Sequence, residues 1–363
     1  MAEILSIATA VPAFCHAQKD ILSFMQHSYG LDETDKRKLG FLYKQSEIQN
    51  RHSVIGDYTD NGQPRTFVPG QHGEAFPNID SRMELYEKEA LPLAISAIEK
   101  VINGFISISE ITHLITVSCT GMSAPGLDLQ IMESLQMAPD IVRTSVNFMG
   151  CYAAIHGLKM AKLICDTTPG ANVIIVAVEL CTIHFQKDFT PDNAASSLLF
   201  ADGAAAVLVS NKKTTNSLSL KKFYAYVDFK GKQDMSWSIS NTGFLMTLSG
   251  YVPQLIQADI ASLVQNALAA NDITIDDITH WCIHPGGKKI LEVVQKQMQL
   301  CDCSMMYAKK VLSEYGNMSS PTVLFVLKEI MTALEDESVK PVNIFGVAFG
   351  PGLTMETFIA GRG

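Results

Sequence analysis

A cysteine, a histidine and an asparagine in this chain stand at turns where their side chains could meet and carry out group transfer. Cys151 follows Gly150, His284 precedes a Pro-Gly-Gly turn, and Asn317 follows Gly316. A thiol is a nucleophile, an imidazole accepts or donates a proton, and a carboxamide donates hydrogen bonds without adding charge. Together these three groups are suited to acyl transfer, in which an acyl chain passes through a thioester on the cysteine.

The three residues occupy equivalent places in an internal repeat. The first copy runs from ITH at 111–113 through VSCTG to GCY, and the second runs from ITH at 278–280 through CIHPGG to YGN. Asn172 before VIIVAV and Asn343 before IFGVAF continue the same register. Residues at the turns and helix starts of a duplicated unit can converge on one centre, and we expect the active site there.

A helix is predicted directly after Cys151, and its N-terminus would favour the thiolate over the thiol. The apolar residues of this stretch recur at a spacing of three or four: Ala154, Leu158, Ala161 and Ile164. Taken singly, each of the three residues also has a structural explanation. The cysteine suits a buried small hydrophobe, the histidine a hydrogen-bonded core position, and the asparagine a helix cap. Their coincidence on matching turns favours the chemical interpretation.

Composition indicates a compact enzyme-sized protein and argues against several other classes. The 363 residues are 47% hydrophobic and 18% charged, which suits a large buried core. A net charge of −9 argues against a nucleic-acid-binding protein, because binding phosphates requires a basic face. No apolar run is long enough to cross a bilayer, and the first residues do not read as a signal peptide.

The eight cysteines predict reduced thiols in a cytoplasmic protein better than a disulfide framework. Cys119 is a rival nucleophile, but no helical pattern follows it directly, so we expect it to line the pocket. Cys301 and Cys303 form a CxC pair that lacks a second pair at zinc-site spacing, so no metal site is predicted. Phosphate-binding glycine loops are absent from the sequence, which argues against dinucleotide or nucleoside triphosphate chemistry.

Short β-branched strands alternate with amphipathic helices along most of the chain, which predicts an α/β fold with parallel strands and crossover helices. The polar run KKTTNSLSLKK after Asn211 marks a change between two halves, residues 1–212 with the cysteine and residues 213–363 with the histidine and asparagine. The segment from Leu31 to Asn78 ends in a long Gly- and Pro-rich stretch, predicted to be either a functional cover or a solvated surface loop.

Six sequence blocks in order resemble one known family. They are VSCTG with a following APG, GCYAA, LFADGAAAVLV, HPGG, SEYGNMSS and FGPGLTMET. The chain resembles the thiolase superfamily and, within it, the type III polyketide synthases of the chalcone and stilbene synthase group. The blocks YGNMSS and FGPGLT-x-ET, taken together, are specific to this family.

The resemblance implies a role for each central residue. Cys151 would be the acyl-accepting nucleophile, and His284 with Asn317 would polarise the thioester carbonyl and stabilise the enolate formed by malonyl decarboxylation. Phe200 matches an aromatic gate between the coenzyme A tunnel and the cavity. The family implies a five-layer αβαβα fold built from two duplicated halves, a homodimer, coenzyme A thioesters as substrates, and no metal or bound cofactor.

The chain departs from the family at the positions that usually hold the coenzyme A phosphates. Lys38 is kept, but the two other matching positions are Phe41 and Gln45. The basic residues that could serve instead are Lys44, Arg51, Lys288 and Lys289, and the alternative is that they form a solvated charged face. These departures leave open whether the donor is a coenzyme A thioester or is bound to an acyl carrier protein.

Two further departures lie in the cavity wall, at Tyr152-Ala153-Ala154 and at Ala348-Phe349, and they would reshape the cavity without removing the three central residues. The residues expected to line the pocket are Cys119, Thr120, His184, Met246, Ser319 and Phe349.

The predicted activity is that of an acyltransferase that joins malonyl units to an acyl thioester starter by decarboxylative Claisen condensation and cyclises the poly-β-keto product. One alternative is a single-condensation enzyme of the β-ketoacyl synthase III kind. Another is a non-catalytic thiolase-fold partner. The starter, the number of extensions and the ring closure depend on cavity shape.

Overall fold

The structure is a computed structural model that describes residues 1–363 except 60–64, 70–74, 336–340 and 363. Its strands are β1 Glu3–Ala10, β2 Phe14–Ala17, β3 Asn50–Ser53, β4 His113–Ser118, β5 Val142–Asn147, β6 Asn172–Leu180, β7 Asp202–Ser210, β8 Leu218–Val227, β9 Met235–Ser240, β10 Gly243–Leu248, β11 His280–Ile283, β12 Val342–Gly350 and β13 Thr354–Arg362. Its α-helices are α1 Gln18–Ser28, α2 Glu33–Gln45, α3 Ile79–Ile102, α4 Leu127–Ser134, α5 Ala153–Thr167, α6 Pro191–Leu199, α7 Val252–Ala269, α8 Lys288–Gln297, α9 Met306–Tyr315 and α10 Pro321–Glu335.

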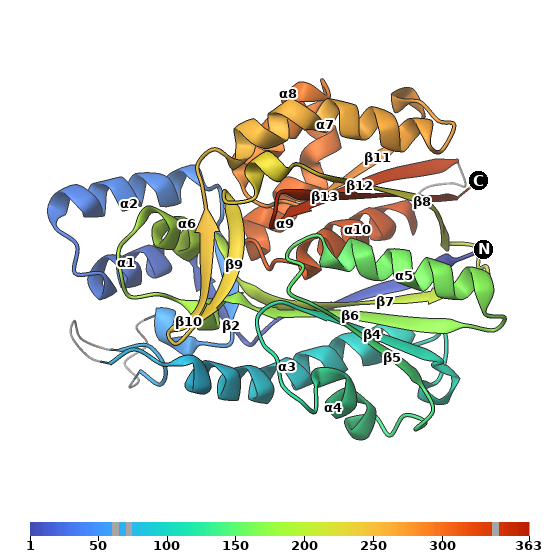
Figure 1. The fold of residues 1–363 in the computed structure, drawn as a ribbon, viewed down its shortest axis with the longest axis horizontal. Coiled ribbons are helices and arrows are strands. Elements are labelled where there is room, and N and C mark those ends of the chain that lie inside the picture. The colour runs from blue at the N-terminus through green and yellow to red at the C-terminus, as the bar shows by residue number, and fades with distance from the viewer. Residues whose placement is uncertain (60–64, 70–74, 336–340, 363) are drawn as a thin grey trace.

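Helices and strands form a stack of five layers, seen from the lower to the upper edge of Figure 1. Helices α3 and α4 cover the strands of the first half, and α5 and α10 lie between those strands and the strands of the second half. Helices α7 and α8 cover the far side. The two central helices contact strands of both halves, so their buried apolar faces join the halves into one core. This arrangement is the predicted αβαβα fold.

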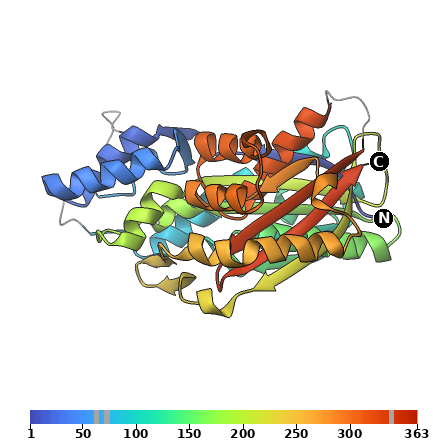
Figure 2. The same ribbon diagram turned by 90° about the horizontal axis from the view of Figure 1, so that it is seen from above.

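The main sheet has the order β11-β12-β13-β8-β1-β7-β6-β4-β5, and the two halves meet at a narrow seam. Strands β1 and β8 pair through only two residue pairs, Glu3 with Ser219 and Ile4 with Leu218. Strands β6 and β7 are buried along their whole length, which explains why VIIVAV and AAAVLV show no polar alternation. In the view from above (Figure 2), helices α1 and α2 project at the end of the molecule away from both termini.

Equivalent residues in the two copies of the internal repeat form the same hydrogen bonds. In the first half, Thr112 Oγ1 donates to Asn172 O at 3.0 Å and accepts from Asn172 N at 2.9 Å. In the second half, Thr279 Oγ1 donates to Asn343 O at 3.0 Å and accepts from Asn343 N at 3.1 Å. Both asparagine side chains also donate to a carbonyl of the short 3-10 turn that precedes the parallel strand. The duplication predicted from sequence is therefore confirmed in backbone geometry.

A buried carboxylate at the end of β6 links the active-site turns of the two halves. Glu179 accepts hydrogen bonds from Cys119 N at 2.9 Å and Thr120 Oγ1 at 2.8 Å in the turn after β4. Its other oxygen accepts from Ser320 Oγ at 2.8 Å, directly before α10. Because the side chain has no exposed surface, these three bonds replace its hydration and fix the two turns relative to each other.

The stretch from Asp57 onward is only partly described. Asp57 accepts hydrogen bonds from Thr66 N, Phe67 N and Val68 N, which folds residues 65–69 back onto it. The rest of the predicted loop, residues 60–64 and 70–74, lies outside the described residues. Among the helices that the structure describes, none is long and apolar enough to span a membrane.

Stability should depend on pH through Glu179. Burial raises the pKa of its carboxyl from 4.5 to about 7, although the three hydrogen bonds oppose the shift. Since the folded state then holds the proton more tightly than the unfolded state, the free energy of unfolding should fall as pH rises from about 4.5 to about 7, by about 3 kcal/mol, and then level off. Glu179→Gln should lose this part of the pH dependence.

The measurement is urea unfolding of both proteins at about pH 5 and about pH 7.5, analysed for the change in unfolding free energy between the two conditions. The exposed Glu133→Gln serves as the matched control and should follow the wild type. If the unfolding free energies of wild type and Glu179→Gln changed equally with pH, Glu179 would not be the source of this pH dependence.

Candidate active site

Cys151 stands in the turn between β5 and α5, two residues before the first helical residue Ala153. The preceding Gly150 has a positive φ of 85°, and a Cβ there would lie 2.2 Å from Pro351 Cδ. Only glycine permits this close approach of the β12–β13 turn to the cysteine turn. The Gly150 N–H donates to Cys119 Sγ at 3.0 Å, so the neighbouring cysteine helps to hold the turn.

His284 follows β11 and is 1% exposed. Its backbone N–H donates to Val347 O at 2.9 Å, which extends the parallel pairing of β11 with β12 by one residue. Neither ring nitrogen has a hydrogen-bond partner. A buried imidazole with both nitrogens unpaired is costly in a folded protein, and it is typical of a group that binds a substrate.

Asn317 lies between α9 and α10 and is attached to Phe200 through its backbone. Its N–H donates to Leu199 O and its carbonyl accepts from Ala201 N, both at 2.9 Å, so that Asn317 and Phe200 form a parallel bridge. The side-chain Oδ1 accepts from Ser319 N at 2.8 Å. This bond fixes the orientation of the carboxamide, whose Nδ2 contacts Gly286 O at 3.3 Å.

These three side chains line one chamber with an empty volume of about 640 Å³. The residues predicted for its wall that do line it are Cys119, Thr120, Phe200, Met246, Ser319 and Phe349. The wall also contains Gly286, Ile290, Leu248 and Pro351, which come from the HPGG turn, α8, β10 and the β12–β13 turn. The chamber is therefore built by both halves.

His184 was expected in this wall but lines an adjacent second chamber instead. Its Nε2 lies 2.7 Å from Thr120 O, its Nδ1 accepts from Phe244 N at 3.1 Å, and its ring stacks on Phe244. Both nitrogens are thus used within the protein, so His184 has a structural role. The second chamber has an empty volume of about 600 Å³ and shares Cys181, Phe200, Trp237 and Met246 with the first.

Because the chamber excludes water, Cys151 and His284 each favour the neutral form when considered alone. Burial raises the pKa of the Cys151 thiol to about 12, against the hydrogen bonds of Ser319 and Asn317 that lower it. Burial also lowers the pKa of the His284 imidazole to about 3. The helix N-terminus alone therefore does not give the standing thiolate expected from sequence. A thiolate in this chamber would need a cationic partner close by, because only a pair of opposite charges offsets the lost hydration.

The basic residues considered for coenzyme A phosphates do not gather into one site. Lys38 and Lys44 lie exposed on α2, where Lys38 pairs with Asp35 at 2.9 Å. Lys288 pairs with Glu47 at 2.7 Å and Lys289 with Glu292 at 3.2 Å. The contact of Lys288 with Glu47 does bring the start of α8 next to the chain that leaves α2. Phe41 on the same helix is 63% exposed.

Arg51 lies away from the surface lysines, in the buried interior, and this position does not support its use as a phosphate ligand at the surface. Arg51 is 4% exposed, donates from Nε to Gln18 Oε1 at 2.8 Å and donates from Nη1 to Phe200 O at 2.6 Å. In the sequence, Arg51 looks like one more basic surface residue. In the fold its side chain points inward, because β3 packs against the body of the molecule. Arg51 therefore supports the backbone of Phe200.

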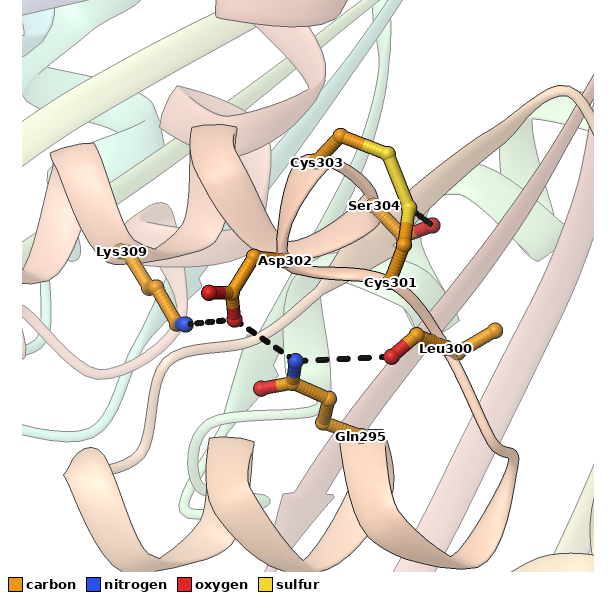
Figure 3. Close-up of a disulfide and its surroundings, with 7 residues drawn as sticks. All are labelled: Gln295, Leu300, Cys301, Asp302, Cys303, Ser304 and Lys309. Atoms are coloured by element: carbon orange, nitrogen blue, oxygen red, sulfur yellow. Dashed lines mark hydrogen bonds and ion pairs between the residues drawn. A yellow bond between two sulfur atoms is a disulfide. The ribbon is translucent and has the colours of Figure 1, made fainter.

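The prediction that all eight cysteines are reduced thiols is wrong for two of them. Cys301 and Cys303 form a disulfide in the turn before α9 (Figure 3), with Cα atoms 5.3 Å apart, a separation that a disulfide can bridge. The other six cysteines are free. Between the pair, Asp302 accepts from Gln295 Nε2 at 2.8 Å and from Lys309 Nζ at 3.0 Å. In the described part of the chain, no group of three or more metal-ligating side chains could hold an ion.

Sequence reasoning missed Glu179 and Trp237. Glu179 is the one charged residue in the apolar run VIIVAVEL, and a carboxylate in such a buried strand was the available signal. Trp237 lies in the β9–β10 hairpin and donates from Nε1 to Cys119 O at 2.7 Å. It had no sequence signal, because one tryptophan in a short strand does not indicate a cavity wall.

Comparisons with known proteins agree with this architecture along the whole chain. Residues 1–212 match the N-terminal domain of chalcone and stilbene synthases, and residues 226–361 match the C-terminal domain. Type III polyketide synthase C of Arabidopsis thaliana is 26% identical, over 99% of this chain and 94% of its own. The alpha-pyrone synthesis polyketide synthase-like protein Pks18 of Mycobacterium tuberculosis is 28% identical, over 98% and 90%.

Among solved structures, PKS-I of the brown alga Ectocarpus siliculosus superimposes with a TM-score of 0.91 at 29% identity, over 99% of this chain and 97% of that one. Matches to both domain families and an almost complete structural superposition lead to one assignment. The chain belongs to the chalcone and stilbene synthase family and is a type III polyketide synthase, an acyltransferase of thiolase-like fold.

Proposed function

We propose that Cys151, His284 and Asn317 carry out decarboxylative condensation of malonyl-coenzyme A onto an acyl-coenzyme A starter. The single observation that supports this best is their meeting in one enclosed chamber, with both His284 nitrogens unpaired and the Asn317 amide fixed by Ser319. A good nucleophile, an oxyanion site and exclusion of water are what the reaction needs.

In the loading step, Cys151 Sγ attacks the carbonyl carbon of the starter thioester while His284 takes the thiol proton. Collapse of the tetrahedral intermediate breaks the bond to the coenzyme A sulfur, which leaves as a thiol with the proton from His284. Donors from His284 and Asn317 would hold the oxyanion. The starter is then an acyl thioester on the enzyme.

In the extension step, the malonyl carboxylate leaves as carbon dioxide and its bonding electrons form an enolate on the remaining thioester. The side chains of His284 and Asn317 would stabilise the enolate oxygen without adding a negative group nearby. The enolate carbon attacks the acyl group on Cys151, and the cysteine sulfur leaves. The lengthened chain is now a coenzyme A thioester, which can load onto Cys151 again or cyclise.

The coenzyme A nucleotide would lie outside the chamber near the start of α8. Gly286 and Ile290 line the chamber, while Lys288 and Lys289 of the same turn and helix reach the surface. Lys44 and Lys38 lie on α2, whose chain comes next to α8 at Glu47. Basic side chains at this rim suit phosphates. A carrier-protein thioester is the alternative donor, since Phe41 replaces one basic group of the family with an exposed ring.

We also infer a homodimer. Strand β5 is the outermost strand beside β4, most of its residues are exposed, and Val142 is 56% exposed. An exposed edge strand is a template for pairing with a second chain. We further propose a cytoplasmic location on the ground that six of the eight cysteines are free thiols, although Cys301 and Cys303 form a disulfide.

Acyl loading tests the central role of Cys151. Incubation with labelled acyl-coenzyme A should add one acyl group per chain, and tandem mass spectrometry should locate it on Cys151. Cys151→Ala should take up none, whereas Cys165→Ala, a buried cysteine outside both chambers, should load normally. Failure of wild type to load any thioester would instead favour a non-catalytic partner.

Iteration is tested in the same assay by adding malonyl-coenzyme A and a panel of acyl starters. Products with two or more added malonyl units should appear in the mass spectrum. Products limited to one extension would point to an enzyme of the β-ketoacyl synthase III kind.

Proton transfer to His284 predicts a change in thiol reactivity. Wild-type Cys151 should react with iodoacetamide at neutral pH, because His284 accepts its proton. His284→Gln should react only at alkaline pH, with the rate rising about tenfold per pH unit, because burial then raises the thiol pKa without a cationic partner. Identical pH profiles for the two proteins would contradict the pairing.

The rim lysines predict a change in KM. Lys288→Ala and Lys289→Ala should each raise KM for malonyl-coenzyme A about twofold to fivefold at unchanged kcat, with a smaller effect at high salt. Lys232→Ala, an exposed lysine in a different surface turn, is the control and should leave KM unchanged. If a carrier-protein thioester is the true donor, the same lysine variants should leave KM for the coenzyme A ester unaffected.

A further inference from the structure

The disulfide between Cys301 and Cys303 takes no part in the steps proposed above, and it is poorly suited to be a structural clasp. It encloses a single residue, Asp302, and a bridge over so short a segment removes little freedom from the unfolded chain. Both cysteines are exposed at the surface. An exposed disulfide that contributes little to stability is open to attack by a thiolate from solvent.

The charged group inside this turn faces away from the two sulfur atoms. Asp302 Oδ1 accepts from Gln295 Nε2 on α8 at 2.8 Å and from Lys309 Nζ on α9 at 3.0 Å. In Figure 3 this carboxylate and the two sulfurs lie on opposite sides of the turn. Because the Lys309 ammonium pairs with the carboxylate, an incoming thiolate meets little repulsion. These contacts do not involve sulfur, so the turn stays attached to both helices when the disulfide opens.

The two sulfur atoms differ in how well each can leave as a thiolate. Cys301 Sγ lies 3.2 Å from Ser304 Oγ, and because a disulfide sulfur has no proton, the hydroxyl is the donor. The same hydrogen bond would stabilise a thiolate on Cys301 as it forms, which makes Cys301 the better leaving group. Attack is therefore expected on Cys303 Sγ.

A surface hollow places this turn beside the rim proposed for the coenzyme A nucleotide. Its lining includes Lys288 at the start of α8 and, farther along, Gln295 and Lys309, which hold Asp302. Each loading step proposed above releases coenzyme A as a free thiol. The reaction therefore supplies a thiol at the same surface as the disulfide.

We propose that the disulfide of Cys301 and Cys303 is a thiol–disulfide exchange site for a small aliphatic thiol, either the coenzyme A that the enzyme releases or a peptide thiol from its surroundings. The thiolate attacks Cys303 Sγ to form a mixed disulfide, the bond between the two cysteines breaks, and Cys301 leaves as a thiolate that takes up a proton. In the reverse step, Cys301 attacks the mixed disulfide and releases the bound thiol. Neither direction needs a further oxidant or reductant. The inference rests on the proposed function only in naming coenzyme A as one source of the thiol.

The test uses Cys151→Ala, purified and handled without oxygen, so that neither the catalytic thiol nor condensation contributes. After addition of coenzyme A, N-ethylmaleimide traps the free thiols, and tandem mass spectrometry identifies the group on each cysteine. Coenzyme A should appear on Cys303 and the alkyl group on Cys301. The other cysteines are free thiols and cannot capture a thiol without an oxidant, so none of them should carry coenzyme A.

Two further variants in this background test the chemistry. Cys301→Ser has no disulfide and should capture no coenzyme A, while its Tm should fall by less than about 3 °C because the bridge spans so few residues. Ser304→Ala keeps the disulfide and should slow exchange about fivefold, because the leaving thiolate loses its donor. Ser23→Ala, at an exposed serine on α1, is the matched control and should exchange at the parent rate.

The same assay with pantetheine and glutathione distinguishes the sources of the thiol. Pantetheine carries the reactive arm of coenzyme A without the nucleotide, so slower exchange with pantetheine would show that the nucleotide is held in the hollow. Faster exchange with coenzyme A than with glutathione, at equal thiolate concentration, assigns the site to the released coenzyme A. The reverse order assigns it to a peptide thiol, and both orders support an exchange site.

Three results would overturn the inference: a disulfide that stays closed with every thiol, two cysteines that are already alkylated before any thiol is added, or a larger loss of Tm in Cys301→Ser, which would make the bridge a structural clasp. Coenzyme A on Cys301, or an unchanged rate in Ser304→Ala, overturns the assigned direction of attack. Condensation is measured separately with the wild-type enzyme. If condensation failed while exchange proceeded, the proposed function would be lost and the exchange site would stand.

Discussion

The active site depends on one interaction, the hydrogen bonding of the buried Glu179 carboxylate to turns from both halves. Two of its bonds hold the turn after β4, which carries Cys119 and Thr120, and the third holds Ser320 before α10. Cys119 in turn supports the backbone before Cys151. A residue with no exposed surface thereby links the turn that supports Cys151 in one half to the segment that carries Asn317 in the other.

Burial is the constraint that the site shares with this carboxylate. The enclosure that excludes water also disfavours every charge within it, so Glu179, Cys151 and His284 all have pKa values displaced toward their neutral forms. A charged group is then stable in the chamber mainly when it is paired with an opposite charge or accepts hydrogen bonds from donors that are already in place. A condensing reaction uses this condition well, because its thiolate and enolate form transiently beside fixed donors.

Sequence patterns predicted much of this arrangement, because short motifs within each copy are enough to reveal the repeat. The two Ile-Thr-His segments and the asparagines Asn172 and Asn343 form matching hydrogen bonds, and the residues at the corresponding turns line one chamber. Local patterns could not show which way a side chain faces. Arg51 and Lys288 look alike in the sequence, yet one is buried behind Phe200 and the other reaches solvent. The second chamber depends on packing between segments far apart in the chain, for which the sequence carries no local signal.

The parallel bridge between Phe200 and Asn317 limits how the wall shared by the two chambers can move. Backbone hydrogen bonds on either side of the bridge and the Arg51 contact to the Phe200 carbonyl immobilise the main chain at this point. A movement of the main chain at Phe200 would displace the Asn317 carboxamide as well. Any widening of the wall at Phe200 would therefore come from rotation of its ring about its own side-chain torsions, a fast rotamer change that leaves the main chain of both segments in place.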